Sequence, residues 1–297
     1  MQIGATTESR NPRTLNLDEL SVDDLLATMN AEDARVPAAV AAALPAIGRT
    51  VRAAAAALRA GGRLIYFGAG TSGRLGVLDA AECPPTFSAS PDQVIGLLAG
   101  GNDAMFRAAE GAEDSAELGA ADLAAIGLTD ADVAVGIAAS GRTPYVIGGL
   151  DYARGVGAVA VSIACNPGAA VSAHADIAIE VDNGPEVLTG STRLKAGTSQ
   201  KLILNMISTA TMVQLGKTYG NLMVDVAPTN VKLVDRAVRI VREATGCDEA
   251  DARRALDESG NHAKTAIVMV LCGIGAAEAR RRLDAAGGFV RAALAAS

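Results

Sequence analysis

The chain has 297 residues, of which half are hydrophobic and one fifth are charged. This composition is typical of a folded globular protein and excludes a disordered one. The formal net charge of -7 repels nucleic acid and anionic membranes, so we expect neither as a partner. Aromatic residues make up 3% of the chain and tryptophan is absent, which disfavours recognition by aromatic stacking.

Cysteine and histidine are too sparse and too scattered to indicate a structural zinc site, and no cofactor is expected. The N-terminal residues lack the apolar core of a signal peptide, and the apolar run 266–277 is too short to span a bilayer. We therefore expect a cytoplasmic, reduced protein. The residues concerned are Cys83, Cys165, Cys247, Cys272, His174 and His262.

In chain order, residues 18–60 come first and are predicted to be helical, with Ser21 as N-terminal cap. Apolar runs then alternate with helical stretches, which indicates a parallel sheet covered on both faces. The predicted strands are 63–67, 93–99, 132–139, 158–164 and 176–181, and the intervening helices are 73–81, 103–126 and 143–155.

A long helix is expected from about Ser199 to Tyr219, and a helical tail from Asn230 onward. Glycines divide this tail into short helices, which is typical of a compact three-helix bundle. The fold class is therefore a doubly wound α/β domain with helices before it and a small helical domain after it. We divide the chain into segments 1–52, 53–225 and 226–297.

Two loops that follow predicted strands resemble each other, because both contain Ser-Gly-Arg. The first runs from Gly68 to Arg74 and includes Gly70, Thr71 and Ser72, and the second includes Ser140, Gly141 and Thr143. Glycine allows close approach to an anion, and hydroxyls and helix-start amides donate hydrogen bonds to it. Two such loops could hold one phosphate, although each could also be a tight turn with a serine cap. The spacing of the glycines disfavours a dinucleotide site.

Carboxylates supply the second candidate site. Glu82 precedes Pro84 and Pro85, which predicts that it lies at a broken helix end, and Glu113 lies in the acidic run 110–115. Spacing alone leaves open whether these groups are catalytic or simply face water. Lys195, close to a predicted helix start, could contact an anion, although helix capping by Thr198 or Ser199 explains that stretch equally well.

Several long motifs then match one family over nearly the whole chain. They include GGRLIYFGAGTSGRLGVLDAAECPPT from Gly61, EGAEDS from Glu110, GIAASGRTPYVIGGLDYAR from Gly136 and EVLTGSTRLKAGTSQKLILNMIST from Glu186. On these motifs the chain resembles the N-acetylmuramic acid 6-phosphate etherases of the sugar isomerase (SIS) superfamily. The resemblance implies a flavodoxin-like SIS domain, a homodimer that completes the site, and a C-terminal bundle similar to ubiquitin-associated domains.

The same resemblance implies that Ser72, Ser140 and Thr143 hold a 6-phosphate, together with the glycine-rich loops around Gly70, Thr71 and Gly141. It also implies that Glu82 and Glu113 are the catalytic acid and base. The implied reaction is elimination of D-lactate from N-acetylmuramic acid 6-phosphate, followed by hydration. For the acid, the neighbouring prolines and apolar residues favour Glu82, whose pKa burial would raise.

Two rival functions share the expected fold. An aldose-ketose isomerase would also remove the C2 proton of a sugar 6-phosphate but would return it to C1. A non-catalytic sugar-phosphate sensor would bind the same ligand and control a partner. Retention of both acidic motifs favours the enzyme. No basic helix-turn-helix precedes the domain, which disfavours a DNA-binding regulator.

Overall fold

The computed structural model describes residues 6–107, 109–226 and 231–295. Contacts between Cα atoms divide the chain into two compact units, and each is described by itself. The first unit comprises residues 1–81 and 92–208, and the second comprises 82–91 and 209–297. Among the described residues, no helix combines the length and the apolar character needed to cross a membrane.

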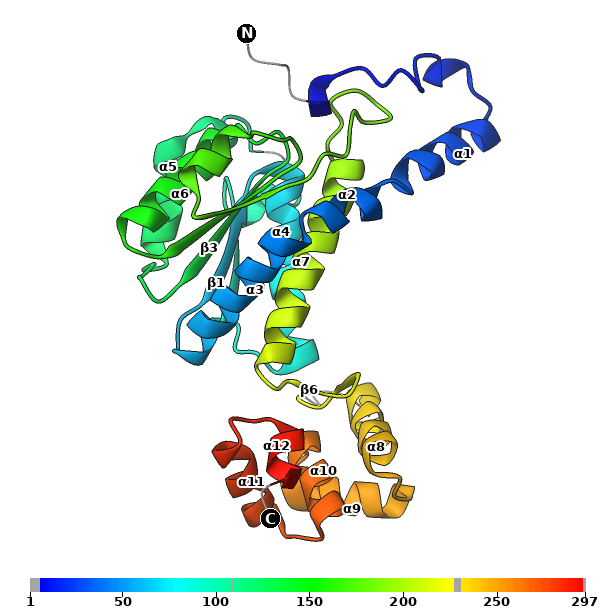
Figure 1. Ribbon diagram of the computed structural model, residues 1–297, viewed down its shortest axis with the longest axis vertical. Coiled ribbons are helices and arrows are strands. Elements are labelled where there is room, and N and C mark those ends of the chain that lie inside the picture. Colours follow the sequence, from blue (N-terminus) through cyan, green and yellow to red (C-terminus); the bar gives the residue numbers. More distant parts are fainter. Residues whose placement is uncertain (1–5, 108, 227–230, 296–297) are drawn as a thin grey trace. The chain divides into compact units, whose positions relative to one another are not determined.

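A five-stranded parallel sheet forms the centre of the first unit (Figure 1). Its strand order, β2-β1-β3-β4-β5, is the flavodoxin-like arrangement and confirms the predicted doubly wound sheet. The strands are β1 (Leu64–Gly68), β2 (Val94–Leu98), β3 (Val133–Ala138), β4 (Val159–Ala164) and β5 (Ile177–Glu180). All five lie within the predicted runs, apart from Gly68 at the end of β1.

Alternate side chains of these strands bury themselves on opposite faces of the sheet. Ile65 and Phe67 pack with Tyr145 and Leu150 under α5 (Ala116–Ala125) and α6 (Pro144–Gly155). Tyr66 faces the other side, where it meets α4 (Gly70–Phe87) at Gly76; a Cβ at that glycine would lie 2.9 Å from the Tyr66 Cβ. Both faces are therefore covered, as the continuous apolar strands predicted.

The N-terminal helices break where proline and small residues interrupt the pattern. They are α1 (Val22–Asp33), α2 (Val36–Ala42) and α3 (Leu44–Arg59), preceded by short 3-10 turns η1 (Thr6–Glu8) and η2 (Leu17–Glu19). The Ser21 side chain accepts a hydrogen bond from the Asp24 amide, so the predicted cap is confirmed. Pro37 and Pro45 each stand in the first turn of a helix, where proline is tolerated.

The segment predicted as one helix over 103–126 is broken into three pieces. These are η3 (Asn102–Met105), η4 (Ala112–Asp114) and α5. Gly111 separates the second piece from what precedes it, because it adopts a left-handed conformation with φ 76°. Beyond β4 and β5, the remaining elements of the sheet unit are η5 (Ala170–His174) and the first part of α7 (Lys195–Gln214).

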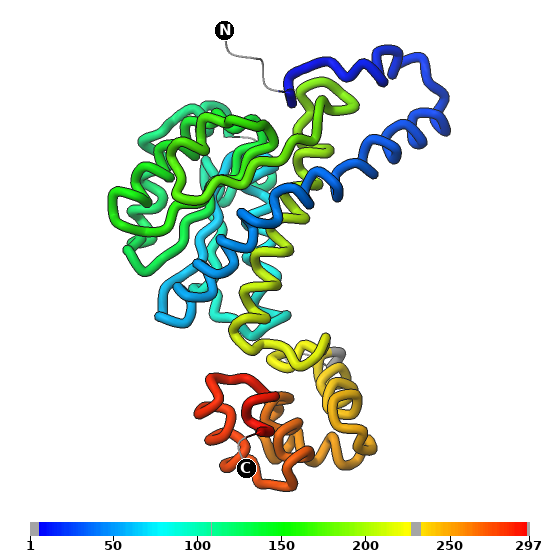
Figure 2. Tube along the Cα trace, viewed as in Figure 1, coloured from blue at the N-terminus to red at the C-terminus, as the bar shows by residue number. Residues whose placement is uncertain are grey.

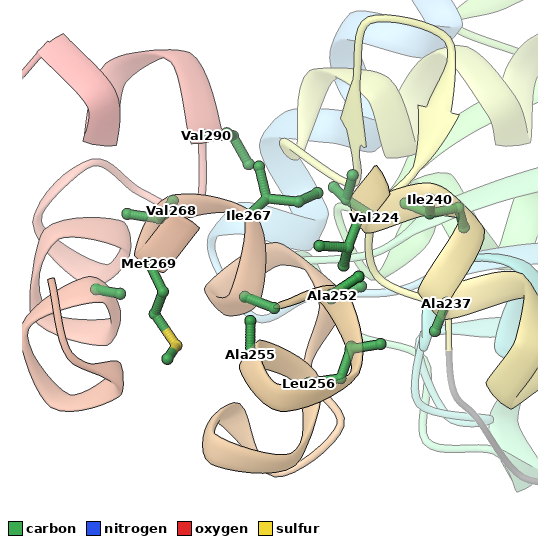
Figure 3. Close-up of a cluster of buried hydrophobic side chains, with 14 of the residues drawn as sticks. Val224, Ala237, Ile240, Ala252, Ala255, Leu256, Ile267, Val268, Met269 and Val290 are labelled. Atoms are coloured by element: carbon green, nitrogen blue, oxygen red, sulfur yellow. The ribbon is translucent and has the colours of Figure 1, made fainter. Parts of the chain in front are cut away.

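The second unit has its own hydrophobic core (Figure 3). In the described part of this unit, a short hairpin of β6 (Thr218–Tyr219) and β7 (Leu222–Met223) is followed by five helices, where a three-helix bundle was expected. They are α8 (Val231–Thr245), α9 (Glu249–Ser259), α10 (Ala263–Cys272), α11 (Ala276–Ala285) and α12 (Val290–Ala295). Gly260 and Gly273 end α9 and α10 in left-handed conformations, as expected of the dividing glycines. Asn230, the expected start of the tail, lies outside the described residues.

Candidate functional site

The first Ser-Gly-Arg loop forms a tight turn from β1 into α4. At Gly73, an added Cβ would lie 2.2 Å from the Gly68 carbonyl oxygen, so only glycine fits this turn. Ser72 lies in the first turn of α4 and is buried, and its hydroxyl donates to Gln200 Oε1 at 3.1 Å. The first amides of a helix have no acceptor within the helix, so those of Gly70 and Thr71 suit an anion.

The second Ser-Gly-Arg loop joins β3 to α6. Gly141 has φ 72°, and a Cβ there would lie 2.4 Å from the Ala169 Cβ. Ser140 Oγ accepts a hydrogen bond from the Arg142 amide at 3.3 Å. Thr143 precedes α6, but its side chain makes no capping hydrogen bond to that helix. Thr143 is half-buried, and its hydroxyl is therefore available to a ligand.

The sheet brings these two loops to the same edge. β1 pairs in parallel with β3, with Gly68 opposite Ile137, so the strands end at the same level. The connection from β1 runs towards β2, whereas that from β3 runs towards β4, and the strand order therefore reverses between the two loops. Ligands of doubly wound sheets bind at this switch point.

A pocket of about 220 Å³ lies beside the first loop. Gly70 and Arg74 line one part of it, and Glu110 and Glu113 line another. The structure thus brings Glu113 to the same pocket as the first loop. Glu113 is exposed and stands on η4, a single 3-10 turn, instead of on the long helix that was predicted.

Arg74 ties η3 to the first loop. Its Nε donates to the Met105 carbonyl at 3.0 Å and its Nη2 to the Ala104 carbonyl at 2.8 Å. The arginine of the first Ser-Gly-Arg therefore holds η3, whereas Arg142 of the second is exposed. This role of Arg74 was not predicted from the sequence, where the repeated Ser-Gly-Arg was the only signal that pointed to this arginine.

Glu82 does not lie at a broken helix end. α4 continues through Pro84 and Pro85 to Phe87, because prolines near the end of a helix interrupt few of its hydrogen bonds. Glu82 is exposed on this helix, so the expected burial of the carboxyl group is wrong for the single chain. It belongs to the second unit, and Glu113 belongs to the first. The neighbouring Cys83 is 2% exposed and packs as a buried thiol.

Lys195 is fully buried at the start of α7. Its Nζ donates to Glu32 Oε2 at 2.7 Å and to the Asn183 carbonyl at 3.0 Å. The Glu186 carboxylate caps this helix by accepting from the amides of Lys195 and Ala196, at 3.0 and 2.9 Å. The ammonium therefore neutralises a carboxylate inside the protein, and its contact with an anionic ligand stays a prediction.

The alternative that Thr198 or Ser199 caps the start of α7 is wrong. Both residues lie within the helix, and their hydroxyls donate to the carbonyls of Leu194 and Ala196, at 3.1 and 2.9 Å. The cap comes instead from Glu186, whose pKa burial raises while the two helix amides oppose that change. A carboxylate nine residues before the helix gives no local sequence signal.

Glu32 is the centre of a buried polar network. Hydrogen bonds from Arg13, Lys195 and Asn11 lower the pKa of its carboxyl group to about 2, against the opposing effect of burial. The Asn11 side chain lies 3.0 Å from Glu32 Oε2 and also donates to the Pro185 carbonyl at 3.3 Å. Three parts of the sequence meet here: the N-terminal segment, α1 and the start of α7.

Both histidines have structural contacts. His174 Nδ1 lies 2.6 Å from Asp151 Oδ1, and the His262 side chain caps α10 by accepting from the Thr265 amide. Within the described ranges, no group of three or more histidine, cysteine or acidic side chains is arranged to hold a metal ion.

Comparison with known proteins places these motifs in a family. Residues 46–154 match the family model described as "Glucokinase regulatory protein N-terminal SIS domain". Residues 115–210 match the model described as "SIS domain". The N-acetylmuramic acid 6-phosphate etherase of Cutibacterium acnes is 62% identical over 91% of this chain and 89% of its own. The protein of the same name from Mycolicibacterium smegmatis is 61% identical over 98% of this chain and 97% of its own.

The chain belongs to the N-acetylmuramic acid 6-phosphate etherase family. A solved phosphoheptose isomerase from Francisella tularensis is 17% identical, with a TM-score of 0.48 over 67% of this chain and 98% of that one. The identity to the etherases extends over both compact units, so the helical tail as well as the sheet unit belongs to the family's chain.

Proposed function

We propose that the protein cleaves the lactyl ether of N-acetylmuramic acid 6-phosphate, giving D-lactate and N-acetylglucosamine 6-phosphate. One observation supports this most directly: Glu113 lines the pocket beside the first Ser-Gly-Arg loop. A ligand held by its phosphate at the two loops would extend a sugar towards a carboxylate. Membership of the etherase family then supplies the substrate.

The chemistry explains why two carboxyl groups suffice. In the open-chain sugar the C2 proton is alpha to the C1 aldehyde and is therefore acidic. A carboxylate removes this proton, and a carboxylic acid protonates the lactyl oxygen as its bond to C3 breaks. Water then adds across the resulting double bond, with hydroxyl at C3 and a proton at C2. Each positioned acid or base contributes about 10²–10⁴-fold in rate.

We assign Glu113 as the base, or as the group that assists hydration, and Glu82 as the acid. A carboxylic acid that donates a proton near neutral pH needs a raised pKa, which burial supplies. Glu82 is exposed in the single chain. Burial of the Glu82 carboxyl group would therefore come from bound substrate or from a second subunit.

The proposed reaction is tested in ¹⁸O-labelled water with purified protein and N-acetylmuramic acid 6-phosphate. We expect D-lactate to be released and one ¹⁸O atom to enter the sugar at C3, because hydration follows cleavage of the C3–O bond. Glucosamine 6-phosphate in the same assay tests the isomerase. Lactate that carries the label, with no label at C3 of the sugar, would contradict elimination.

We also propose that the protein is a cytoplasmic homodimer. Val22 and Leu26 are 71% and 59% exposed and lie four residues apart, hence on one face of α1. Leu15 and Leu188, 55% and 54% exposed, flank the hydrogen bond from Thr14 to the Val187 carbonyl. Large exposed apolar side chains of this kind commonly mark protein interfaces.

Light scattering during size exclusion is expected to give about twice the chain mass of 29.9 kDa. Leu26→Lys should shift this mass towards the monomer, because a lysine charge would be buried in the interface. Leu271→Lys, at a 41% exposed position in the second unit, is the matched control. A dimer that survives Leu26→Lys would move the interface away from α1.

A further inference from the structure

The first described residues of the chain lie against the loop that follows β4. Thr6 Oγ1 donates to Asn166 Oδ1 at 2.8 Å, and the Thr7 amide donates to the same oxygen at 3.2 Å. Thr7 is 1% exposed, although it is polar and close to the chain end. Thr7 is therefore buried as fully as a core residue.

Asn166 connects this segment to the second Ser-Gly-Arg loop. Its Nδ2 lies 3.0 Å from Thr7 Oγ1, 3.2 Å from the Ala139 carbonyl and 3.1 Å from the Ser140 carbonyl. The side chain is 4% exposed, and its amide group has two hydrogens to share among these three acceptors. One buried side chain thus holds the carbonyls on both sides of the Ser140 Cα.

These two contacts fix the direction of the Ser140 side chain. Each peptide group is planar, so holding its carbonyl also fixes the orientation of the whole group. The two peptide groups that Asn166 holds are those before and after the Ser140 Cα. Fixing both sets φ and ψ of Ser140, and hence the direction of its Cα–Cβ bond. The hydrogen bond from the Arg142 amide to Ser140 Oγ then holds the hydroxyl in one rotamer.

The same N-terminal segment is anchored a second time, on the loop that follows β5. The Asn11 side chain donates to the Pro185 carbonyl at 3.3 Å, and Thr14 Oγ1 donates to the Val187 carbonyl at 2.8 Å. Arg13 pairs with Glu32. Figure 2 shows the segment in dark blue beside this long yellow-green loop. Residues 6–14, which we call the N-terminal strap, are therefore fixed at both ends.

We propose that the N-terminal strap positions Ser140 for phosphate binding, with Thr6, Thr7 and Asn166 as positioning residues. These residues act through Ser140. The inference rests on the proposed phosphate site, and it predicts that the contacts of Thr6 and Thr7 with Asn166 control affinity for the phosphate more than the rate of chemistry.

Thr7→Val removes the hydroxyl at Asn166 and keeps the shape and the backbone amide. We expect KM for N-acetylmuramic acid 6-phosphate to rise about three- to ten-fold and kcat to change less than about two-fold, as the loss of one buried hydrogen bond implies. Asn166→Ala should raise KM at least about ten-fold. The Kd for N-acetylglucosamine 6-phosphate should rise by the same factors, while that for N-acetylglucosamine stays unchanged.

Thr14→Val is the matched control, because Thr14 is also a buried strap threonine, but its hydroxyl contacts the Val187 carbonyl instead of Asn166. It should lower thermal stability about as much as Thr7→Val and leave KM unchanged. Equal effects of the two variants on KM would reduce the strap to a purely structural element and overturn the proposal.

Amide hydrogen exchange in the ligand-free protein separates this inference from the proposed function. Thr7→Val should speed exchange at residues 139–143 several-fold relative to wild type and to Thr14→Val, whether or not the protein has etherase activity. Unchanged exchange there would contradict the positioning role even in an active enzyme. An inactive wild type with faster exchange in the variant would instead contradict only the proposed function.

Discussion

Glu113→Gln and Glu82→Gln are each expected to lower kcat by about 10²–10⁴-fold, the range for one general acid or base. Neither change should alter the thermal midpoint by more than a degree or two, because both side chains are exposed and surface substitutions change stability little. KM should change much less than kcat, since the phosphate contacts remain.

Asp114→Asn is the control for Glu113→Gln. Asp114 is the next residue on η4 and is also exposed, so its loss removes the same charge without removing the proposed base. Initial rates and KM for all three variants separate the roles. If kcat of Glu113→Gln stays within two-fold of wild type, Glu113 is not the base. If Asp114→Asn lowers kcat as much as Glu113→Gln does, the loss reflects the negative charge of the segment and not a catalytic role of Glu113.

Lys195→Met is expected to destabilise the protein by about 3 kcal/mol, because it leaves Glu32 buried with one cation fewer. Arg13→Met should cost less than about 1 kcal/mol, since the Arg13 side chain is 46% exposed. Urea unfolding at pH 7 compares the two. Equal losses in the free energy of unfolding for the two variants would indicate that burial of the Lys195 ammonium group does not add to the stability of the fold.

The same network predicts a dependence on pH. The folded pKa of Glu32 is about 2, below the value of 4.5 for an unperturbed glutamate. A carboxyl group with a depressed folded pKa stabilises the fold above its unfolded pKa and loses that contribution as the pH falls through the folded value. The stability difference between wild type and Glu32→Gln should therefore shrink between about pH 4.5 and pH 2.

Much of the first unit could be predicted from the sequence because its signals are local. Buried parallel strands are continuous apolar runs, and a glycine-rich loop follows β1 directly, so the sheet and the two loops were found by their composition. The adjacency of the loops then follows from the flavodoxin-like strand order, which the family resemblance supplied. Glu113 reaches the pocket for the same reason, since its segment follows β2, the neighbour of β1.

The remainder depends on contacts between residues far apart in the sequence. Asn166 meets Thr7 across 159 residues and Lys195 meets Glu32 across 163, and neither pair carries a pattern that a single sequence reveals. The Pro84-Pro85 pair predicted a helix end, but α4 continues to Phe87. The exposure of Glu82 was also not predictable from the sequence, because its neighbours in the sequence are apolar residues and prolines and it still faces solvent.

The position of the N-terminal strap has a practical consequence for how this protein is handled. Thr6 and Thr7 contact Asn166 directly, so an affinity tag fused shortly before Thr6 would join the chain close to the Asn166 contacts. Kinetic constants measured on such a fusion would report on the tag as well as on the chemistry. Enzymologists comparing variants of Ser140 would do best to cleave the tag or to fuse it elsewhere.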